Sequence, residues 1–259
     1  ILESGDVSRW LANSRNFAVL PYTPRAQIYV EKELKIKYPK AFTYLSEFKD
    51  ALTKGSVYKK YGMNKPFYFV RNASDRMLSD YKVVWSHMGN ELAAAVITPV
   101  TDPYLGNKPV IPEHVMAFIP TNTEDEAHYI CAILNSTLVN LILQSIAKGG
   151  KNFASPELIN NINIKRYNEL NPIHARLVEL SKKAHQLAQQ NQLDELKKVE
   201  DEIDKTVAEL YRLTNEELKE IKRSLAILKG EEVEEEEGEP IPILEPDIIL
   251  RNNVVDEGE

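Results

Sequence analysis

The spacing of apolar residues changes at Thr123, and this change constrains the fold more than any other feature of the 259-residue chain. Before Thr123, apolar residues form short runs, and prolines such as Pro21 and Pro120 end some of them. Such runs are typical of strands. After Thr123, apolar residues recur every three or four positions over long stretches, which is typical of amphipathic helices. The sequence therefore predicts an α+β fold of mixed α/β character, in which a sheet-containing body precedes a helical hairpin or bundle.

The first half contains six stretches of strand composition and two of helical spacing. The expected strands are residues 17–20, 27–30, 66–70, 82–85, 92–97 and 115–119. The expected helices are residues 31–37 and 41–52. The first of these should end before Pro39, because a residue that precedes proline disfavours helical geometry.

The second half contains signals for the starts and ends of helices. Thr123 with Glu126, and Thr214 with Glu217, fit the capping-box pattern. Ser155 before Pro156 fits a helix start. The expected elements are a helix at 123–147, a short helix from Pro156, a strand at 161–167, two long antiparallel helices at 172–190 and 193–213, and a third helix that ends at Gly230.

Charge is distributed unevenly along the chain. We expect residues 1–170 to form the α/β body and residues 171–230 to form a helical spacer or docking segment. Residues 231–259, the acidic tail, hold 12 acidic residues and 1 basic residue, which predicts a disordered segment. The net charge of −7 comes from this tail, since residues 1–230 carry +4. An alternative for the apolar part of the tail, residues 241–250, is docking on the body or on a partner.

Composition also bears on location. No run reaches the ~18 apolar residues that a membrane helix needs, and the first residues lack the features of a signal peptide. The single cysteine, Cys131, cannot form an internal disulfide. We therefore expect a cytoplasmic protein with no membrane partner. The missing initiator methionine indicates a part of a longer or processed protein.

The spacing of reactive residues does not fit an active site within the chain. Residues 101–104 read TDPY, similar to the Asp-Pro-Pro-Tyr loop of amino-methyltransferases, but the second proline is missing and a surface turn fits better. No glycine-rich turn follows a strand, so a nucleotide or S-adenosylmethionine site is not expected. The five histidines lack metal-ligand spacing. We expect no catalytic residue, metal site or cofactor site in this segment.

Residues 31–85 interleave basic and aromatic side chains. Between residues 31 and 82 there are 12 lysines and arginines and 6 acidic residues, a balance of +6. Basic side chains bind phosphates by releasing counterions, whereas amide and imidazole groups can read base edges. We therefore expect DNA or another polyanion to bind the loops of this stretch and a second basic loop near residue 150.

The candidate contact residues fall into two groups, those that would bind phosphates and those that would read base edges. The candidates for phosphate are Lys59, Lys60, Lys65, Arg71, Arg76, Lys148 and Lys151, and those for base edges are Asn64, Asn72, Asn152 and His87. On the alternative interpretation these loops are ordinary polar surface. On either interpretation we expect Tyr58, Tyr61, Tyr68 and Trp85 to be core or half-buried framework residues, although base stacking is the alternative.

Short motifs along the chain resemble one family in their order. They are GDVSRW at 5–10, LPY at 20–22, EL at 33–34, YPK at 38–40, YL at 44–45, FK at 48–49 with Leu52, PFY at 66–68, KVVW at 82–85, CAILNS at 131–136 and ELYRLT at 209–214. Their collinear arrangement, over roughly residues 1–228, is similar to the TaqI-like C-terminal specificity region of adenine-N6 DNA methyltransferases, including fused type IIG restriction–modification enzymes.

The resemblance implies a recognition domain without a catalytic half. In that family an N-terminal domain binds S-adenosylmethionine and methylates an adenine that is flipped out of the duplex, while the C-terminal domain grips double-stranded DNA and reads its sequence. This chain lacks the S-adenosylmethionine and Asn-Pro-Pro-Tyr motifs. The implied partners are therefore double-stranded DNA and an N-terminal methyltransferase domain or subunit. The implied parent is a site-specific methyltransferase of restriction–modification and phage defence, with or without endonuclease activity.

A protein–protein interaction module is the alternative function. The helical hairpin would then bind a partner within a DNA-modification or phage-defence complex, and the basic stretch would be ordinary surface. The recognised DNA sequence and the oligomeric state stay open at this point.

Overall fold

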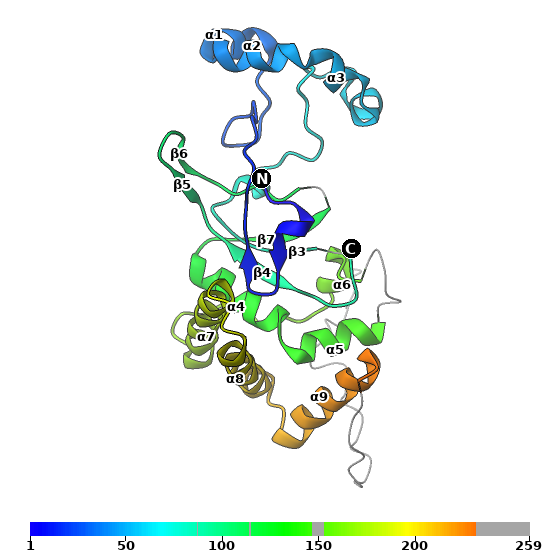
Figure 1. Cartoon of the computed structure of the whole chain (residues 1–259), viewed down its shortest axis with the longest axis vertical. Coiled ribbons are helices and arrows are strands. Elements are labelled where there is room, and N and C mark those ends of the chain that lie inside the picture. Colours follow the sequence, from blue (N-terminus) through cyan, green and yellow to red (C-terminus); the bar gives the residue numbers. More distant parts are fainter. Residues whose placement is uncertain (87, 114, 147–152, 232–259) are drawn as a thin grey trace, which may run out of the picture. The chain divides into compact units, whose positions relative to one another are not determined.

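The structure is a computed structural model that describes residues 1–86, 88–113, 115–146 and 153–231. It has the α+β fold that the sequence predicts, with small antiparallel sheets and a largely helical second half (Figure 1). The chain divides into two compact units. Unit 1 consists of Ile1 and Asn16–Ser79, and unit 2 of Leu2–Arg15 and Asp80–Glu259.

Unit 1 is built from short helices and turns. Its elements are α1 (Glu31–Lys37), α2 (Pro39–Glu47), α3 (Lys49–Lys54), the π-helical turn η2 (Tyr58–Gly62) and the 3-10 turn η3 (Arg76–Leu78). The helix expected at residues 31–37 is confirmed. Pro39 is the first residue of α2, a position where its missing N–H costs nothing. The core of unit 1 is small and consists of Leu34, Leu45, Phe67 and Tyr68.

Three strands expected in unit 1 are wrong. Residues 17–20 and 27–30 contain no strand, and the Tyr22–Ile28 bridge is isolated. Residues 66–70 begin with a turn in which the Phe69 amide donates to the Pro66 carbonyl at 2.9 Å. Their apolar character reflects burial of Phe67 and Tyr68 against helices, since no neighbouring strand is present to pair with them. The helix expected at 41–52 is two helices, because the backbone leaves helical geometry at Phe48.

Unit 2 is organised around a three-stranded antiparallel sheet of order β4-β3-β7. Its strands are β3 (Tyr81–Ser86), β4 (Ala94–Ile97) and β7 (Met116–Thr121), which confirms the three strands expected there. In the centre of the sheet, Val83 pairs with Val96 on one side and Ile119 on the other. Two small hairpins were not expected: β1 (Val7–Ser8) with β2 (Leu11–Ala12), and β5 (Val100–Asp102) with β6 (Gly106–Lys108). The 3-10 turn η1 (Ser4–Asp6) precedes β1.

The strand expected at residues 161–167 is wrong. This segment has no regular secondary structure, although its Ile162 is buried. Tyrosine hydroxyls from two helices donate hydrogen bonds to its backbone carbonyls. The Tyr211 hydroxyl donates to the Asn163 carbonyl at 2.8 Å, and the Tyr129 hydroxyl donates to the Lys165 carbonyl at 2.9 Å. Two carbonyls of the segment are therefore satisfied by side chains.

The helices of unit 2 follow the sheet. They are α4 (Glu124–Leu134), α5 (Thr137–Ile146), α6 (Pro156–Ile159), α7 (Pro172–Gln189), α8 (Leu193–Tyr211) and α9 (Asn215–Lys229). The helix starts expected at Ser155, Pro172 and Thr214 are confirmed, and Thr214 with Glu217 forms the expected capping box. Gly230 ends α9 with a φ of 77°, a left-handed conformation that suits glycine.

The single helix expected at 123–147 is interrupted at Asn135 and Ser136. The Asn135 side chain accepts from the Ala94 amide and donates to the Ala94 carbonyl, both at 2.8 Å, and so ties the helix end to β4. Asp204 of α8 accepts from the backbone amide and hydroxyl of Thr137 at 2.8 and 2.7 Å. These contacts start a new helix in a different direction, at 58° to α4.

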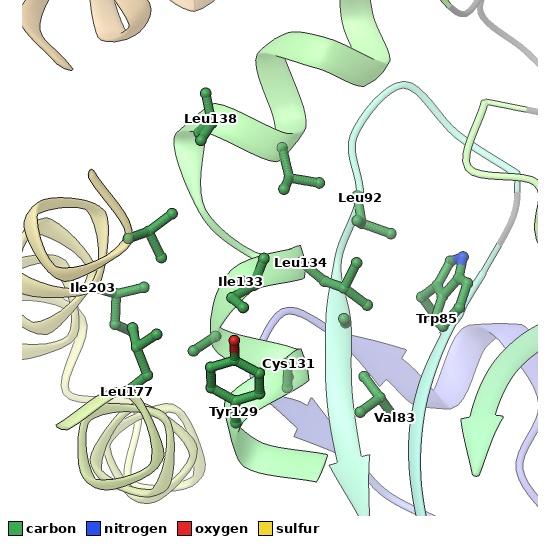
Figure 2. Packing of buried hydrophobic residues seen from close by; sticks show 14 of the residues in the cluster. Val83, Trp85, Leu92, Tyr129, Cys131, Ile133, Leu134, Leu138, Leu177 and Ile203 are labelled. Carbon is green, nitrogen blue, oxygen red and sulfur yellow. The ribbon is translucent and has the colours of Figure 1, made fainter. Parts of the chain in front are cut away.

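One hydrophobic core joins the sheet of unit 2 to its helices. Figure 2 shows Val83 and Trp85 of the sheet on one side of α4, and Leu177 of α7 and Ile203 of α8 on the other. The expected domain boundary at residue 170 therefore lies within unit 2, because α7 and α8 share this core with the sheet. Within the described residues, no single helix is long and apolar enough to cross a membrane; α4 and α5 reach that length only as a bent pair.

Candidate nucleic-acid interface

Seven of the eleven expected DNA-contact residues lie in unit 1. They are Lys59, Lys60, Asn64, Lys65, Arg71, Asn72 and Arg76, and all seven are exposed. None of them forms an ion pair with a carboxylate in the part of the chain that the structure describes. The other four, His87, Lys148, Lys151 and Asn152, lie outside the described residues.

Tyr58 holds the first basic turn in shape. Its hydroxyl donates to the Lys65 carbonyl at 3.0 Å and so closes the turn that carries Lys59 and Lys60. The ring of Tyr58 packs on Gly62, where an added Cβ would lie only 2.5 Å from ring atom Cδ2. Glycine is therefore required by this close approach. The expectation that Tyr58 serves the framework agrees with these two contacts.

Tyr61 brings two cations together. The Arg71 guanidinium lies 4.4 Å from the centre of the Tyr61 ring, and the Lys60 Nζ lies 5.1 Å from it. Each contact is within cation–π range, which contributes about 0.5–1 kcal/mol at an exposed site. The ring, itself 40% exposed, thereby links the turn at Lys60 to the segment that begins at Arg71.

The second basic segment, residues 71–76, is anchored at the residue before it, Val70. At Val70, the Tyr22 hydroxyl accepts from the amide at 2.9 Å and donates to the carbonyl at 3.1 Å. Burial raises the pKa of Tyr22, so its hydroxyl keeps its proton. Asn72 has a φ of 61°, a left-handed turn conformation that asparagine tolerates. Within the segment, one oxygen of the Asp75 carboxylate accepts a hydrogen bond from the backbone amide of Arg76 at 2.8 Å.

Two of the four aromatic residues expected in the framework are fully buried. Tyr68 belongs to the core of unit 1, and its hydroxyl donates to the Tyr29 carbonyl at 2.8 Å. Burial raises the pKa of Tyr68 to about 12. Trp85 lies in the core of unit 2, where its indole donates to the Ala154 carbonyl at 2.8 Å. Tyr61 differs from both, since it is exposed beside two cations.

The basic surplus of the chain lies in unit 1. Residues 16–79 hold 12 lysines and arginines and 5 acidic residues, a balance of +7. Residues 2–15 and 80–230 hold 19 basic and 22 acidic residues, a balance of −3. Unit 2 also uses many of its charges internally: Lys222 binds Asp201 and Asp204 at 2.6 and 3.2 Å, and Lys182 binds Asp125 at 2.6 Å. A polyanion would therefore meet its complementary charge on unit 1.

The histidines of unit 2 have structural surroundings. His185 Nε2 accepts from the Val96 amide at 2.9 Å, and His128 Nδ1 lies 3.0 Å from the Ser181 hydroxyl. Burial lowers the pKa of His128 to about 3 and that of His185 to about 4, so both are neutral near pH 7. Burial also raises the pKa of the Cys131 thiol. The described residues contain no group of three or more His, Cys, Asp or Glu side chains placed to hold a metal ion.

The TDPY sequence spans the end of β5 and the start of the β5–β6 turn. The Asp102 side chain accepts from the amides of Tyr104 and Leu105, both at 2.8 Å, and Tyr104 is 93% exposed. Sequence reasoning identified this surface turn but missed the strands on either side of it. It also missed the role of Tyr61, because Arg71 meets that ring only in the folded chain and the spacing of ten residues carries no signal.

The resemblance motifs in unit 2 form its framework. Trp10 is buried, its amide donates to the Ala94 carbonyl at 3.0 Å, and its indole donates to Glu200 at 2.7 Å. The Arg9 guanidinium donates to the carbonyl of Asn135, which belongs to the motif at 131–136. Motifs far apart in the sequence thus meet around the sheet. Comparison with known protein families finds no matching family, and comparison with curated proteins finds no similar protein.

Proposed function

We propose that this chain is a target-recognition domain for double-stranded DNA, from a restriction–modification adenine-N6 DNA methyltransferase, and that the catalytic half lies elsewhere. The observation that carries the proposal is the pair of exposed cations beside Tyr61, Lys60 and Arg71, which form no ion pair with a described carboxylate, in a unit of charge +7. Such a surface supplies phosphate binding without sequence information. The collinear motifs of the specificity region support the same function, and a cytoplasmic location is part of the proposal.

The roles of the residues differ in kind. Lys59, Lys60, Lys65, Arg71 and Arg76 would bind phosphates and set the position of the domain on the duplex. Asn64 and Asn72 sit in turns among these cations, where an amide can pair with an adenine edge. A separate methyltransferase domain or subunit would hold S-adenosylmethionine and carry out methyl transfer. This chain would then supply binding energy and sequence choice.

The proposal is tested by removing two adjacent lysines. Lys59→Ala with Lys60→Ala should weaken binding to every duplex and reduce the slope of log affinity against log salt by about 1.8, since each phosphate contact contributes about 0.9. The measurement is fluorescence anisotropy of a labelled duplex between about 50 and about 200 mM salt.

Lys197→Ala with Lys198→Ala is the matched control. These two exposed lysines of α8 are also adjacent and belong to unit 2, so the variant loses the same charge away from unit 1. The control should bind like the parent chain. If the Lys59/Lys60 variant overlays the parent at all salt concentrations, the assigned contacts are wrong. If the parent itself does not bind at about 50 mM salt, the alternative of a protein–protein interaction module is favoured.

A further inference from the structure

Unit 1 exposes a row of large apolar side chains, which we call the apolar face: Tyr44, Phe48 and Leu52. Tyr44 lies in α2, Phe48 at the junction of α2 and α3, and Leu52 in α3; they are 51%, 45% and 40% exposed. The Leu52 amide donates to the Phe48 carbonyl at 2.9 Å across the start of α3. The rings of Tyr44 and Phe48 contact each other edge to face, with centroids 5.1 Å apart. A contiguous exposed apolar group of this kind marks an interaction site more often than an isolated side chain does.

Basic residues accompany the apolar face. Lys40 lies one helical turn before Tyr44, and Lys54 lies at the end of α3; both are exposed. With Lys49, the two helices hold three lysines against Glu47 and Asp50, a balance of +1. Unit 1 as a whole carries +7. A ligand for this surface would therefore combine apolar side chains with a large negative charge.

The acidic tail has this combination in its sequence. It holds 12 acidic residues and 1 basic residue, and Ile243, Leu244, Ile248 and Ile249 lie close together behind its acidic run. The charge of −11 is opposite in sign to that of unit 1. The opposite charges of the tail and unit 1, together with the apolar residues that both contain, point to the tail as the ligand of the apolar face.

The apolar residues of the tail lie at the end of a long tether. Ile243 and Ile249 follow Glu231 by 12 and 18 residues, which at about 3.3–3.6 Å per residue allows separations of up to about 40 and about 60 Å. A tethered ligand also acts at a local concentration near the millimolar range, so even modest affinity is sufficient for occupancy.

We propose that the acidic tail binds the apolar face of unit 1 and competes with DNA for its basic surface. The apolar part of the tail covers Tyr44, Phe48 and Leu52, while its carboxylates interact with the cations that would otherwise bind phosphates. DNA must displace the tail, which makes binding weaker and more selective for sites that make additional contacts. The competition with DNA depends on the proposed function, whereas the docking of the tail does not.

Docking is tested with a variant of the 259-residue chain in which four apolar residues of the tail become serine while every charge is kept: I243S, L244S, I248S and I249S. A labelled peptide of residues 231–259 should bind this variant saturably, with a dissociation constant in the micromolar range. Adding Tyr44→Ser, Phe48→Ser and Leu52→Ser should weaken the peptide at least about tenfold. The same four serines placed in the peptide should weaken it equally, because charge alone is not sufficient.

Tyr104→Ser with Leu105→Ser is the matched control, since it removes exposed apolar groups from the β5–β6 hairpin of unit 2. This control should leave the affinity of the peptide unchanged. The proposal is overturned if the peptide does not bind, or if it binds equally well after the three changes in the apolar face. Binding by the tail of a second copy would appear as dimers that dissociate on dilution, and would overturn docking within one chain.

Competition is tested by comparing the affinities of the parent chain and of the variant with the serine tail for duplex DNA. The variant with the serine tail should bind DNA at least about threefold more tightly than the parent, although the two have equal charge. Equal affinities would overturn the competition. If neither chain binds DNA while the peptide still binds the apolar face, the proposed function fails and the docking of the tail stands.

Discussion

At the scale of single residues, the position of Tyr61 explains how flexible cations become an ordered surface. Lysine and arginine side chains lose much rotamer freedom when they are held in one place. The Tyr61 ring offsets part of this loss before any ligand binds, because it attracts Arg71 at 4.4 Å and Lys60 at 5.1 Å. A phosphate would then meet two cations that are already close together.

Tyr61→Leu should therefore weaken DNA binding while leaving the fold intact. Leucine keeps apolar bulk but has no negative ring face, so each cation loses an interaction of about 0.5–1 kcal/mol. The expected loss of affinity for duplex DNA is about two- to fivefold if one of the two cation–π contacts contributes to binding, and larger if both contribute. Fluorescence anisotropy measures this loss, and circular dichroism checks the fold. Tyr104→Leu, at an exposed tyrosine of unit 2, is the control; equal effects of the two changes would contradict a role for the ring.

At the scale of elements, the sequence predicted those whose signals are local. Helices α7, α8 and α9 combine amphipathic spacing with local start or stop signals, and all three were predicted within two residues. Strands β3, β4 and β7 were also predicted, because their apolar runs are visible in the sequence. In the structure these runs pack against the helices of unit 2. The expected contact residues of unit 1 lie in turns, as the polar composition of those loops indicated.

The elements that were missed depend on contacts between distant residues. The sequence near residues 66–70 does not reveal whether a strand pairs with them. Their burial against α1 and α2 depends on the tertiary fold. The break at Asn135 requires Ala94 and Asp204, which lie 41 residues before it and 69 after it. The same limit applies to the candidate site, where Arg71 approaches Tyr61 only after folding.

The break between α4 and α5 yields a prediction about stability. In Asn135→Ala the buried Ala94 amide loses its side-chain partner, whereas the Ala94 carbonyl keeps the Trp10 amide as a donor. An unsatisfied buried group costs about 1–3 kcal/mol, so the free energy of unfolding should fall by about that amount. Urea denaturation followed by circular dichroism measures this change. Asn215→Ala, at an exposed position of α9, should change stability little; a similar loss in both variants would contradict the role given to Asn135.

At the scale of the whole molecule, framework and charge are divided between the two units. Unit 2 contains the large core, in which the sheet, α4, α7 and α8 pack together, and several of its charges bind each other. Unit 1 has a core of only four fully buried residues but carries the basic surplus. A small core gives low local stability. The surface that the proposed function needs is therefore carried by the less stable unit.

This division predicts that unit 1 can be loosened without unfolding unit 2. Phe67→Ala removes a ring that lies 4.9 Å from Tyr68 and 6.2 Å from Phe42, and such a truncation costs about 3–5 kcal/mol. Hydrogen exchange should then become fast in α1, α2 and α3 but stay slow in α4, α7 and α8. Affinity for duplex DNA should fall at least about tenfold, because the cations lose their fixed spacing. Leu177→Ala, in the core of unit 2, should instead accelerate exchange in α4 and α7. If Phe67→Ala accelerates exchange equally throughout the chain, the two units unfold as one, and the basic surface depends on the large core as well as on the small one.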